Sequence, residues 1–354
     1  MKKIVSILFI ILNIVAVALL LLSTISGVVS PSKNAYISLL SYGYFYFLLL
    51  NLFFILVWLF FRRKEFLISL VAILVRFTFL PIHIQLGGTQ ELGDAEFADI
   101  DSTTVVRLMT FNTHGFHGVD DSLVADSGAL HFVKIVRENQ PDVMCLQEFF
   151  SPGKVRVIDS LERMGYKHHH NVGKGTMGSV IFSKLPFDFV GETGSSTKFF
   201  VDVVKGSKTF RLFCVHLTSY QMVGTDAEAL ERLAHGTVDS ATELTAKKLV
   251  HTQRMHETEW KEVLLPKIKE SPYPVILAGD FNDPPSSYLY QKAQKVLEDS
   301  FVEQGRGLGT TYHGPFPAFR IDYVLHSDTI KALTYKRIKS DISDHYPVVV
   351  DLKL

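Results

Sequence analysis

Polar side chains stand at or near the ends of six otherwise apolar, strand-like runs of this sequence. They are Asn112, Glu148, His216, Asp280, Asn282, Asp322, Asp344 and His345, in the runs "LMTFN", "VMCLQE", "FCVHL", "VILAGDFND", "FRIDYVL" and "SDHYPV". Alone, a short pattern such as "SDHYPV" indicates only a turn. However, an unpaired carboxylate in a packed core is strongly destabilising, so burial does not explain the whole set. If the strands are neighbours, these groups gather at one rim.

The chemistry of this set suits a divalent cation and a phosphoester. Carboxylate and amide oxygens are the ligands of Mg²⁺, which takes few protein carboxylates and keeps several waters, whereas zinc prefers nitrogen and sulfur. His216 and His345 can serve as hydrogen-bond donors or as acid/base groups that stabilise charge on a pentavalent phosphorus. The residues therefore predict a Mg²⁺ site, with Mn²⁺ as a substitute ion, at which a phosphoester is hydrolysed.

The elements that would position these residues alternate along residues 104–354. Strand-like runs such as "TVVRLMTF", "DVMCLQE", "TFRLFCVHL" and "YPVILAGD" are bounded by turn formers. Helical spacing marks residues 128–139, a long stretch from about 240 to 270, and residues 286–298. Such alternation predicts an α/β fold with helices covering the sheet faces, in one domain of about 250 residues.

The motifs, taken in order, resemble a known family. The series "TFNTHG", "CLQE", "GSVIFSK", "CVHL", "GDFND", "RIDYVL", "SDHYPV" is similar to the endonuclease/exonuclease/phosphatase superfamily over about residues 104–354. That superfamily includes pancreatic deoxyribonuclease, abasic-site endonucleases, neutral sphingomyelinases and inositol-polyphosphate 5-phosphatases. The resemblance implies a four-layer α/β-sandwich, two packed β-sheets flanked by helices, with the site at one rim.

The resemblance also implies roles for the metal-side residues. Asn112 and Glu148 match the family's metal-site positions, and Asp344 falls in the metal shell of some members. Asp280 and Asn282 match the "GD-x-N" pair, which orients or deprotonates the attacking water and contacts the phosphate. The alternative for Asn112 is that it only caps a turn.

The remaining catalytic positions concern the two histidines. His345 matches the histidine of "SDH", and Asp322 matches the acid that orients it, although a purely structural carboxylate is the alternative there. His216 matches the second histidine of the nuclease and sphingomyelinase branches; the abasic-site branch has another residue at that position. Asp280 and His345 both remain candidates for the general base.

Three further polar residues are candidates for substrate binding. His114 lies in the loop after Asn112, Asn171 precedes the "GSVIFSK" strand, and Tyr312 precedes Asp322. An aromatic side chain such as Tyr312 could stack on a base or a head group. For His114 the alternative is an exposed loop, and for Tyr312 it is a packed loop.

The first 86 residues contain three apolar stretches, at 4–29, 36–61 and 66–84, of which only the third carries a charge, Arg76. A helix that crosses a bilayer needs about 20 mostly apolar residues, so these stretches predict transmembrane helices. A signal peptide is the rival explanation for the first, but its apolar core exceeds the usual length of about 7–15 residues. We expect a membrane region at 1–86, a linker at 87–103 and a catalytic domain at 104–354.

Basic residues predict the orientation in the membrane. Lys2 and Lys3 precede the first stretch and 62–64 lie between the second and third, whereas the first loop has only Lys33. The positive-inside rule then places the N-terminus in the cytoplasm and the catalytic domain on the extracytoplasmic side. The bilayer is therefore one expected partner and a phosphoester substrate the other; no protein partner can be inferred.

Charge and cysteine content narrow the function classes. Residues 103–354 carry 29 basic and 30 acidic side chains, which is not the broad positive field of a protein that grips long nucleic acid. Cys145 and Cys214 lie in apolar runs and are interpreted as small buried residues. The leading prediction is a membrane-anchored, nuclease-like phosphodiesterase. The alternatives are a lipid head-group phosphodiesterase, an inositol phosphatase and, more remotely, an inactive membrane scaffold.

Overall fold

The computed structural model of the chain describes residues 2–91, 93, 101–119, 123–150, 156–173, 178–193, 198–220, 225–226, 228–229, 232, 237, 239–314 and 319–354. Much of the expected linker, residues 92 and 94–100, therefore lies outside the described residues. By internal contacts the chain forms two compact units. One contains Met1–Ile82, Tyr220–Thr258 and Asp283–Ala293, and the other contains His83–Ser219, Glu259–Asn282 and Gln294–Leu354.

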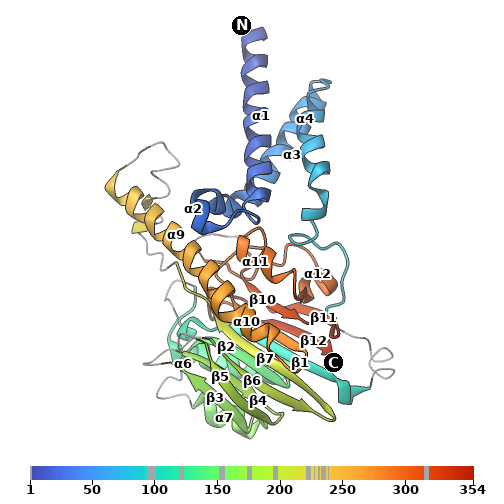
Figure 1. The fold of residues 1–354 in the computed structure, drawn as a ribbon, viewed down its shortest axis with the longest axis vertical. Coiled ribbons are helices and arrows are strands. Elements are labelled where there is room, and N and C mark those ends of the chain that lie inside the picture. The colour runs from blue at the N-terminus through green and yellow to red at the C-terminus, as the bar shows by residue number, and fades with distance from the viewer. Residues whose placement is uncertain are drawn as a thin grey trace. The chain divides into compact units, whose positions relative to one another are not determined.

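Two mixed β-sheets build the second unit, each with six strands among the described residues (Figure 1). The first sheet has the order β11 (Lys331–Arg337), β12 (Val348–Lys353), β1 (Val105–Asn112), β2 (Val143–Phe149), β4 (Gly178–Ser183), β3 (His168–Val172). The second has the order β5 (Phe187–Glu192), β6 (Lys198–Lys205), β7 (Lys208–His216), β8 (Val275–Asp280), β10 (Asp322–His326), β9 (Glu298–Asp299). In each sheet one central pair is parallel, β1 with β2 and β7 with β8, and its other pairs are antiparallel.

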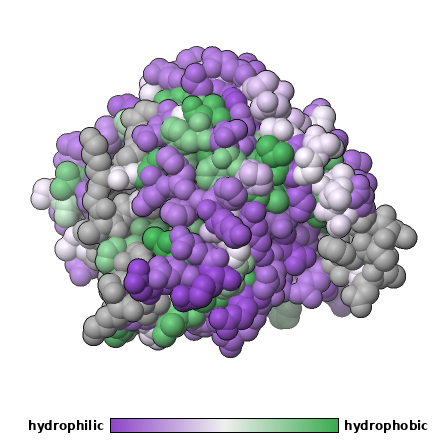
Figure 2. Space-filling model, turned by 90° about the horizontal axis from the view of Figure 1, so that it is seen from below, coloured by the Kyte–Doolittle hydropathy of each residue, from purple (hydrophilic) through white to green (hydrophobic). Residues whose placement is uncertain are grey.

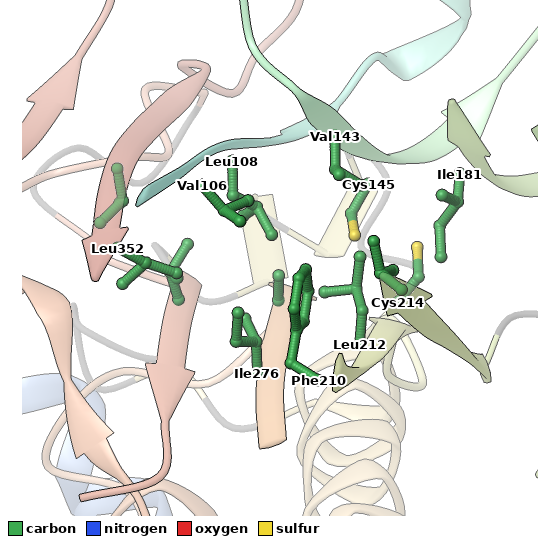
Figure 3. Packing of buried hydrophobic residues seen from close by; sticks show 14 of the residues in the cluster. Val106, Leu108, Val143, Cys145, Ile181, Phe210, Leu212, Cys214, Ile276 and Leu352 are labelled. Carbon is green, nitrogen blue, oxygen red and sulfur yellow. The ribbon is translucent and has the colours of Figure 1, made fainter. Parts of the chain in front are cut away.

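The two sheets pack face to face through a buried apolar cluster, which Figure 3 shows from close by. Val106, Leu108 and Cys145 of the first sheet meet Leu212 and Cys214 of the second. Both cysteines are free and buried, and burial raises the pKa of the Cys145 thiol well above its ordinary value. This confirms the prediction that they are small core residues.

Helices cover the outer faces of the sheets. A second buried cluster joins the first sheet to α6 (Ala125–Asn139) and α7 (Val157–Arg163). On the second sheet, Lys198 of β6 makes a buried 2.7 Å ion pair with Glu259, the first residue of the π-helix η5 (Glu259–Leu264). Short helices α10 (Leu265–Lys269) and α12 (Ser300–Gln304), and 3-10 turns η3 (Ser102–Thr104) and η4 (His114–Phe116), complete this unit. The predicted α/β-sandwich is confirmed.

Helices form the first unit. They are α1 (Lys2–Ile25), α2 (Pro31–Leu39), the 3-10 turn η1 (Leu40–Gly43), α3 (Tyr44–Phe60), α4 (Phe66–Val75) and the 3-10 turn η2 (Phe77–Phe79), followed later in the chain by α9 (Ser240–Thr258) and α11 (Tyr288–Ala293). Of these, α1, α3 and α4 are strongly apolar, whereas α9 is polar. Two segments, Ile4–Ile25 and Pro31–Phe60, are long and apolar enough to cross a membrane. Most exposed large apolar side chains belong to this N-terminal region, whereas the face seen in Figure 2 is largely hydrophilic with scattered apolar residues.

The third predicted membrane helix, 66–84, is shorter in the structure. Its α-helical part ends at Val75, and after Arg76 the chain continues as the 3-10 turn η2 and then through Pro81. Ten α-helical residues span about 15 Å, roughly half of the hydrocarbon core of a bilayer. Proline at 81 cannot supply a backbone donor to extend the helix.

A buried polar cluster ties α1, α3 and α4 together. Asn13 Nδ2 donates to Ser69 Oγ (2.5 Å), and Ser69 Oγ donates to Asn51 Oδ1 (2.8 Å). Trp58 Nε1 donates to Asn13 Oδ1 (2.9 Å). All four side chains are buried, so these bonds link the three helices from within.

The two compact units do not follow the expected division at residues 86 and 104. Helix α9 and the segment Asp283–Ala293 belong to the catalytic part of the sequence, yet they cluster with the N-terminal helices. Helix α9 packs against α2, and Glu257 of α9 accepts hydrogen bonds from Ser30 Oγ (2.5 Å) and from the backbone N–H of Ser32 (2.7 Å). Its carboxylate thus satisfies a free donor at the N-terminus of α2.

Candidate active site

The ends of four strands meet at one rim of the sandwich. Asn112 ends β1, and Glu148 lies one residue before the end of the parallel neighbour β2. In the other sheet, His216 ends β7 and stands in register with Asp280 at the end of β8. Because parallel neighbours end at the same edge, each sheet contributes one such pair, and β1 contacts β8 while β2 contacts β7.

Antiparallel strands bring two more side chains to this rim. Asp322 begins β10 directly opposite Asp280, and His345 lies three residues before β12, the antiparallel partner of β1. An antiparallel strand begins where its neighbour ends. The sequence therefore carries its polar residues after some strands and before others, yet all of them reach the same edge.

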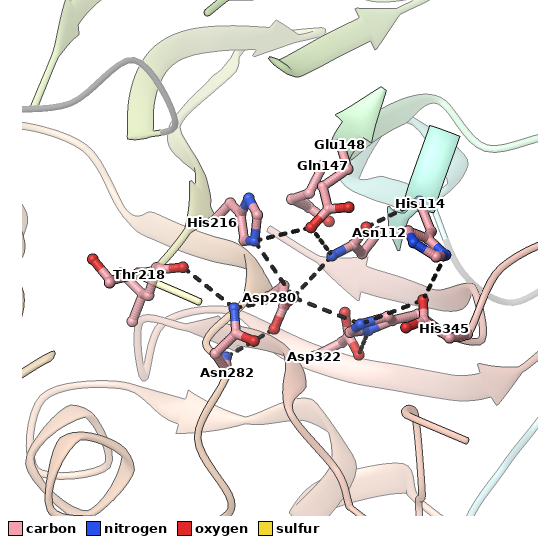
Figure 4. A network of polar contacts seen from close by, with 12 residues as sticks. Asn112, His114, Gln147, Glu148, His216, Thr218, Asp280, Asn282, Asp322 and His345 are labelled. Atoms are coloured by element: carbon pink, nitrogen blue, oxygen red, sulfur yellow. Dashed lines mark hydrogen bonds and ion pairs between the residues drawn. The ribbon is translucent and has the colours of Figure 1, made fainter. Parts of the chain in front are cut away.

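Asp280 lies at the centre of the resulting network (Figure 4). Its Oδ2 accepts a hydrogen bond from Asn112 Nδ2 (3.0 Å) and lies 3.8 Å from His216 Nε2. Glu148 Oε1 lies 3.4 Å from the same Asn112 nitrogen and 3.6 Å from His216 Nε2. The Asn112 amide and the His216 ring thus each bridge the carboxylates of Glu148 and Asp280.

A second arm of the network runs through His345. Its Nδ1 lies 2.8 Å from Asp322 Oδ2, and its Nε2 lies 3.8 Å from Asp280 Oδ2. The ligand atoms of Asp280, Asp322 and His345 all lie within 4.8 Å of one another, and the three residues are buried. Burial alone lowers the pKa of His345, but the carboxylates of Asp322 and Asp280 raise it to about 10. The imidazole is therefore held in its charged form. At Asp280, burial raises the pKa of the carboxyl group.

Asn282 joins the two chain segments that leave the rim. Its backbone N–H donates to Asp280 Oδ1 (2.8 Å), and its Nδ2 donates to the carbonyl oxygen of Leu217 (3.2 Å), the residue after His216. These two bonds fix the turn that follows β8 and attach it to the residue that follows β7.

Three of these residues adopt a backbone conformation that is unusual for a side chain larger than glycine. The φ angles are 48° at Glu148, 54° at Asn282 and 43° at His114, in the left-handed region. At Glu148 the pairing of β2 with β4 is irregular between Leu146 and Phe149. The conformation turns the Glu148 side chain toward the rim.

Asp344 and His114 lie at the outer edge of the network. Asp344 Oδ1 is 3.6 Å from His114 Nδ1 and 4.0 Å from His345 Nε2, and the backbone N–H of His114 donates to Asn112 Oδ1 (3.1 Å). The rings of Tyr312 and His345 meet in a T-shaped arrangement, with a 5.1 Å centroid separation. The structure thus gathers Asp344, His114 and Tyr312 with the predicted catalytic residues.

Asn171 is placed differently. It is exposed on β3, the edge strand of the first sheet, and β4 separates β3 from β2. Among the described residues no contact links its side chain to the network around Asp280. Its role in substrate binding stays a prediction.

Two residues that support the site were missed in the sequence. Ser343 Oγ donates to the carbonyl oxygen of Asn112 (2.8 Å) and accepts from the backbone N–H of His345 (3.0 Å). Thr311 Oγ1 accepts from the backbone N–H of Asp322 (3.0 Å). The serine of "SDH" signals a side-chain turn, whereas Thr311 stands in no recognisable pattern.

The donor set fits a divalent cation. Four carboxylates, from Glu148, Asp280, Asp322 and Asp344, meet three imidazoles, from His114, His216 and His345. With all four carboxylates ionised, the cluster therefore keeps a net negative charge even if every imidazole is protonated. Asp322 is already engaged with His345, although its buried Oδ1 has no hydrogen-bond partner among the described residues. The Glu148 side chain is 28% exposed, which leaves room for the waters that a hard cation keeps.

Comparison with sequence families gives two matches. The model of the family described as "Endonuclease/Exonuclease/phosphatase family" matches residues 109–345. A "Domain of unknown function (DUF8431)" matches residues 4–83. No curated protein matches the chain.

Solved structures share the fold at low sequence identity. An endonuclease/exonuclease/phosphatase from Bacteroides vulgatus is 17% identical, with 71% of this chain and 99% of that chain covered and a TM-score of 0.50. One from Beutenbergia cavernae DSM 12333 is 21% identical, with 71% and 72% covered and a TM-score of 0.46. The human Nocturnin catalytic domain with bound sulfate is 17% identical, with 72% and 96% covered and a TM-score of 0.45. The similarity to the Bacteroides vulgatus structure supports the two-sheet fold that carries the site.

Proposed function

Because the chain belongs to the endonuclease/exonuclease/phosphatase family and is a metal-dependent phosphoesterase, we propose that it is a membrane-anchored, Mg²⁺-dependent phosphodiesterase that acts by in-line attack of water. The observation that carries this proposal is the convergence on Asp280. Its carboxylate meets Asn112, His216 and His345, which come from three different segments of both sheets.

Asp280 is the residue that we propose to orient and deprotonate the attacking water. Its Oδ1 accepts from the backbone N–H of Asn282, whereas its Oδ2 accepts from Asn112 and lies 3.8 Å from the Nε2 atoms of His216 and His345. Oδ2 is therefore the oxygen that faces the other site residues. His345 is a poor base because Asp322 and Asp280 both favour its charged form. We assign it instead the stabilisation of negative charge on the phosphoryl oxygens, with Asp322 fixing its ring. His216, between Glu148 and Asp280, is a second donor to the phosphoryl group.

Glu148 and Asn112 would hold the metal ion, with Asp344 at the edge of the same cluster of side chains. When bound, Mg²⁺ supplies positive charge that polarises the phosphoryl oxygen and offsets the charge of the leaving group. The exposed side of Glu148 supports this assignment, since Mg²⁺ binds through few carboxylates and retains waters. His114 and Tyr312, at the outer edge, are the proposed contacts to the substrate.

The N-terminal region supports membrane anchoring. Two segments are long and apolar enough to span a bilayer, and polar side chains tie α1, α3 and α4 into a bundle. The basic residues 62–64 between α3 and α4, like Lys2 and Lys3, favour the cytoplasmic side. We propose that the N-terminus is cytoplasmic and that the catalytic domain is extracytoplasmic. An anchor of this kind also favours a second candidate function, hydrolysis of a phospholipid head group.

A substrate panel tests this function. The full-length protein in detergent is assayed with bis-p-nitrophenyl phosphate, p-nitrophenyl phosphate, plasmid DNA, RNA, sphingomyelin and inositol phosphates. We expect the diesters to be cleaved faster than the monoester, in the presence of Mg²⁺ or Mn²⁺ and not after chelation. Turnover that persists in EDTA would contradict the metal-dependent mechanism, and exclusive cleavage of monoesters would contradict the phosphodiesterase assignment.

A further inference from the structure

A buried polar network lies in the first compact unit and is centred on Asp283. Its Oδ1 accepts hydrogen bonds from Tyr42 Oη (2.6 Å), Tyr220 Oη (3.1 Å) and Gln253 Nε2 (2.8 Å). Its Oδ2 lies 3.0 Å from His256 Nδ1. Asp283 and His256 are each 1% exposed. A buried carboxylate that accepts three hydrogen bonds and faces an imidazole is held firmly in one position.

The residues around Asp283 come from distant parts of the sequence. Gln253 and His256 belong to α9, and Tyr220 stands in the segment that follows β7. Tyr42 lies in η1, within the second apolar stretch of the N-terminal region. The Tyr42 and Tyr220 hydroxyls also bond to each other at 2.7 Å, and their rings meet edge to face at 5.6 Å. Tyr42 is therefore the contribution of the N-terminal region to this network.

Two chain segments lead directly from the catalytic rim into the network. Asp283 is the residue after Asn282, and Tyr220 is four residues after His216. Asn282 has a left-handed φ of 54°, and its amides bond to Asp280 and Leu217. A turn in this conformation keeps its shape only while the chain on both sides is held. Asp280 at the end of β8 holds one side, and Asp283 in the network holds the other.

We propose that Tyr42 is a positioning residue for the phosphoesterase reaction: by bonding to Asp283, it fixes the turn that carries Asp280 and Asn282. Hydrolysis then depends on the N-terminal region as part of the catalytic machinery, in addition to any role as an anchor. Removing the hydroxyl leaves Asp283 with fewer donors, and the turn samples other conformations. This inference rests on the proposed function for its kinetic consequence, but its structural consequence can be measured without a substrate.

Other contacts indicate that the N-terminal region is built to meet this network. Ser286 Oγ, three residues after Asp283, donates to the carbonyl oxygen of Ser41 (2.7 Å), which immediately precedes Tyr42. Glu257, next to His256, bonds to Ser30 and Ser32 near the start of α2. The Tyr42 bond is thus one of several polar contacts between these segments, and its loss should leave them docked.

Hydrogen–deuterium exchange of Tyr42→Phe, in the full-length protein in detergent, tests the structural part. The phenylalanine ring can keep the contact with Tyr220, so only the hydroxyl is lost. We expect the backbone amide of Asn282 to exchange about tenfold faster, which corresponds to one lost hydrogen bond to a charged group. Peptides from β12 should exchange as in the wild type. The matched control is Tyr36→Phe, because Tyr36 lies in the same region and is 69% exposed; it should change neither readout.

Steady-state kinetics of the same variants test the functional part. We expect Tyr42→Phe to lower kcat about tenfold with KM within about twofold of wild type, because orientation of the water is impaired and binding is not. Tyr42→Phe added to Asp283→Asn should have little further effect, since both changes act through one contact.

The possible negative results separate the positioning role of Tyr42 from the proposed function of the protein. If Tyr42→Phe leaves exchange at residues 280–283 unchanged, the positioning role is refuted, whatever the kinetics show. If exchange rises equally throughout the protein, or if KM rises and kcat does not fall, Tyr42 is only a structural residue and the proposal is again overturned. If the wild-type protein hydrolyses no phosphoester, the proposed function fails, while the exchange measurement still decides whether Tyr42 holds the turn.

Discussion

Replacement of Asp322 by asparagine removes the carboxylate nearest to His345 while keeping the shape of the side chain. In the structure Asp322 Oδ2 lies 2.8 Å from His345 Nδ1. The two neighbouring carboxylates raise the pKa of His345 from its ordinary 6.5 to about 10, against the effect of burial. Since one pKa unit corresponds to about 1.4 kcal/mol, the fold favours the charged imidazole by about 5 kcal/mol.

The expected change follows from this value. A nearby opposite charge commonly shifts a pKa by about 1–3 units, so Asp322→Asn should bring the pKa of His345 down to about 7–9 in the metal-free protein. Asp280 still favours the charged form in the variant, which is why the pKa should stay above the ordinary value. If charged His345 stabilises negative charge on the phosphoryl oxygens, the kcat of Asp322→Asn should fall as the pH rises through about 7–9, whereas the kcat of the wild type should hold until about pH 10.

The effect on stability has a defined pH window. A histidine whose pKa is raised by folding adds stability that is complete below its unfolded pKa, near 6.5, and is lost as the pH rises through its folded pKa. The wild-type contribution from His345 should therefore decline between pH 6.5 and about 10. In Asp322→Asn the decline should end at a lower pH, and the contribution at acidic pH should be smaller by about 1–4 kcal/mol.

NMR of histidine-labelled protein in EDTA measures this directly. The imidazole resonances of wild type and Asp322→Asn are followed from pH 5 to 11, and His345→Gln identifies the signal of His345. Urea titrations at several pH values give the corresponding free energies of unfolding. A wild-type pKa near 6.5, or the same pKa in both proteins, would refute the account of this site as a charged histidine held by two carboxylates.

Three further predictions concern the site, the bundle and the core. Asp280→Asn should lower kcat by at least about 10³ while the thermal midpoint stays equal or rises, because a costly buried carboxylate is neutralised; a variant with wild-type turnover would show that Asp280 is not the base. Ser69→Ala should lower the free energy of unfolding in detergent by about 0.6–2 kcal/mol, because Asn13 and Asn51 both lose their bond to it; unchanged denaturation would argue against a tied bundle. Cys145 and Cys214 should resist a thiol reagent in the native protein and react in denaturant, as expected of buried thiols, and rapid native labelling would contradict the packing in Figure 3.

The architecture of the catalytic part follows from local patterns. Apolar runs bounded by turn formers marked the central strands, and the motif order predicted the two-sheet sandwich. The rim was predictable because each polar residue interrupts an apolar strand at one end: Asn112, Glu148, His216 and Asp280 after their strands, and Asp322 at the start of its own. Strand polarity then brings both kinds to one edge.

The rest depended on contacts that no local pattern shows. Tyr42 and Asp283 are 241 positions apart in the chain, and nothing in the surrounding hydropathy pairs them. The apolar pattern of 66–84 also gave a helix longer than the structure has, because hydropathy does not detect the change to 3-10 geometry after Val75. Ser343 looked like an ordinary turn residue, and its bond to the end of β1 exists only once the two strands are neighbours.

The left-handed backbone at Glu148, Asn282 and His114 implies a trade between stability and activity. Each such residue costs on the order of 1–3 kcal/mol, somewhat less for asparagine. Glycine at position 148 would adopt the same φ without a steric penalty, so a descendant freed from catalytic selection would gain stability by losing its acidic side chain there. Glutamate at that strained position therefore indicates that a related protein is still catalytically active, whereas glycine there indicates lost activity.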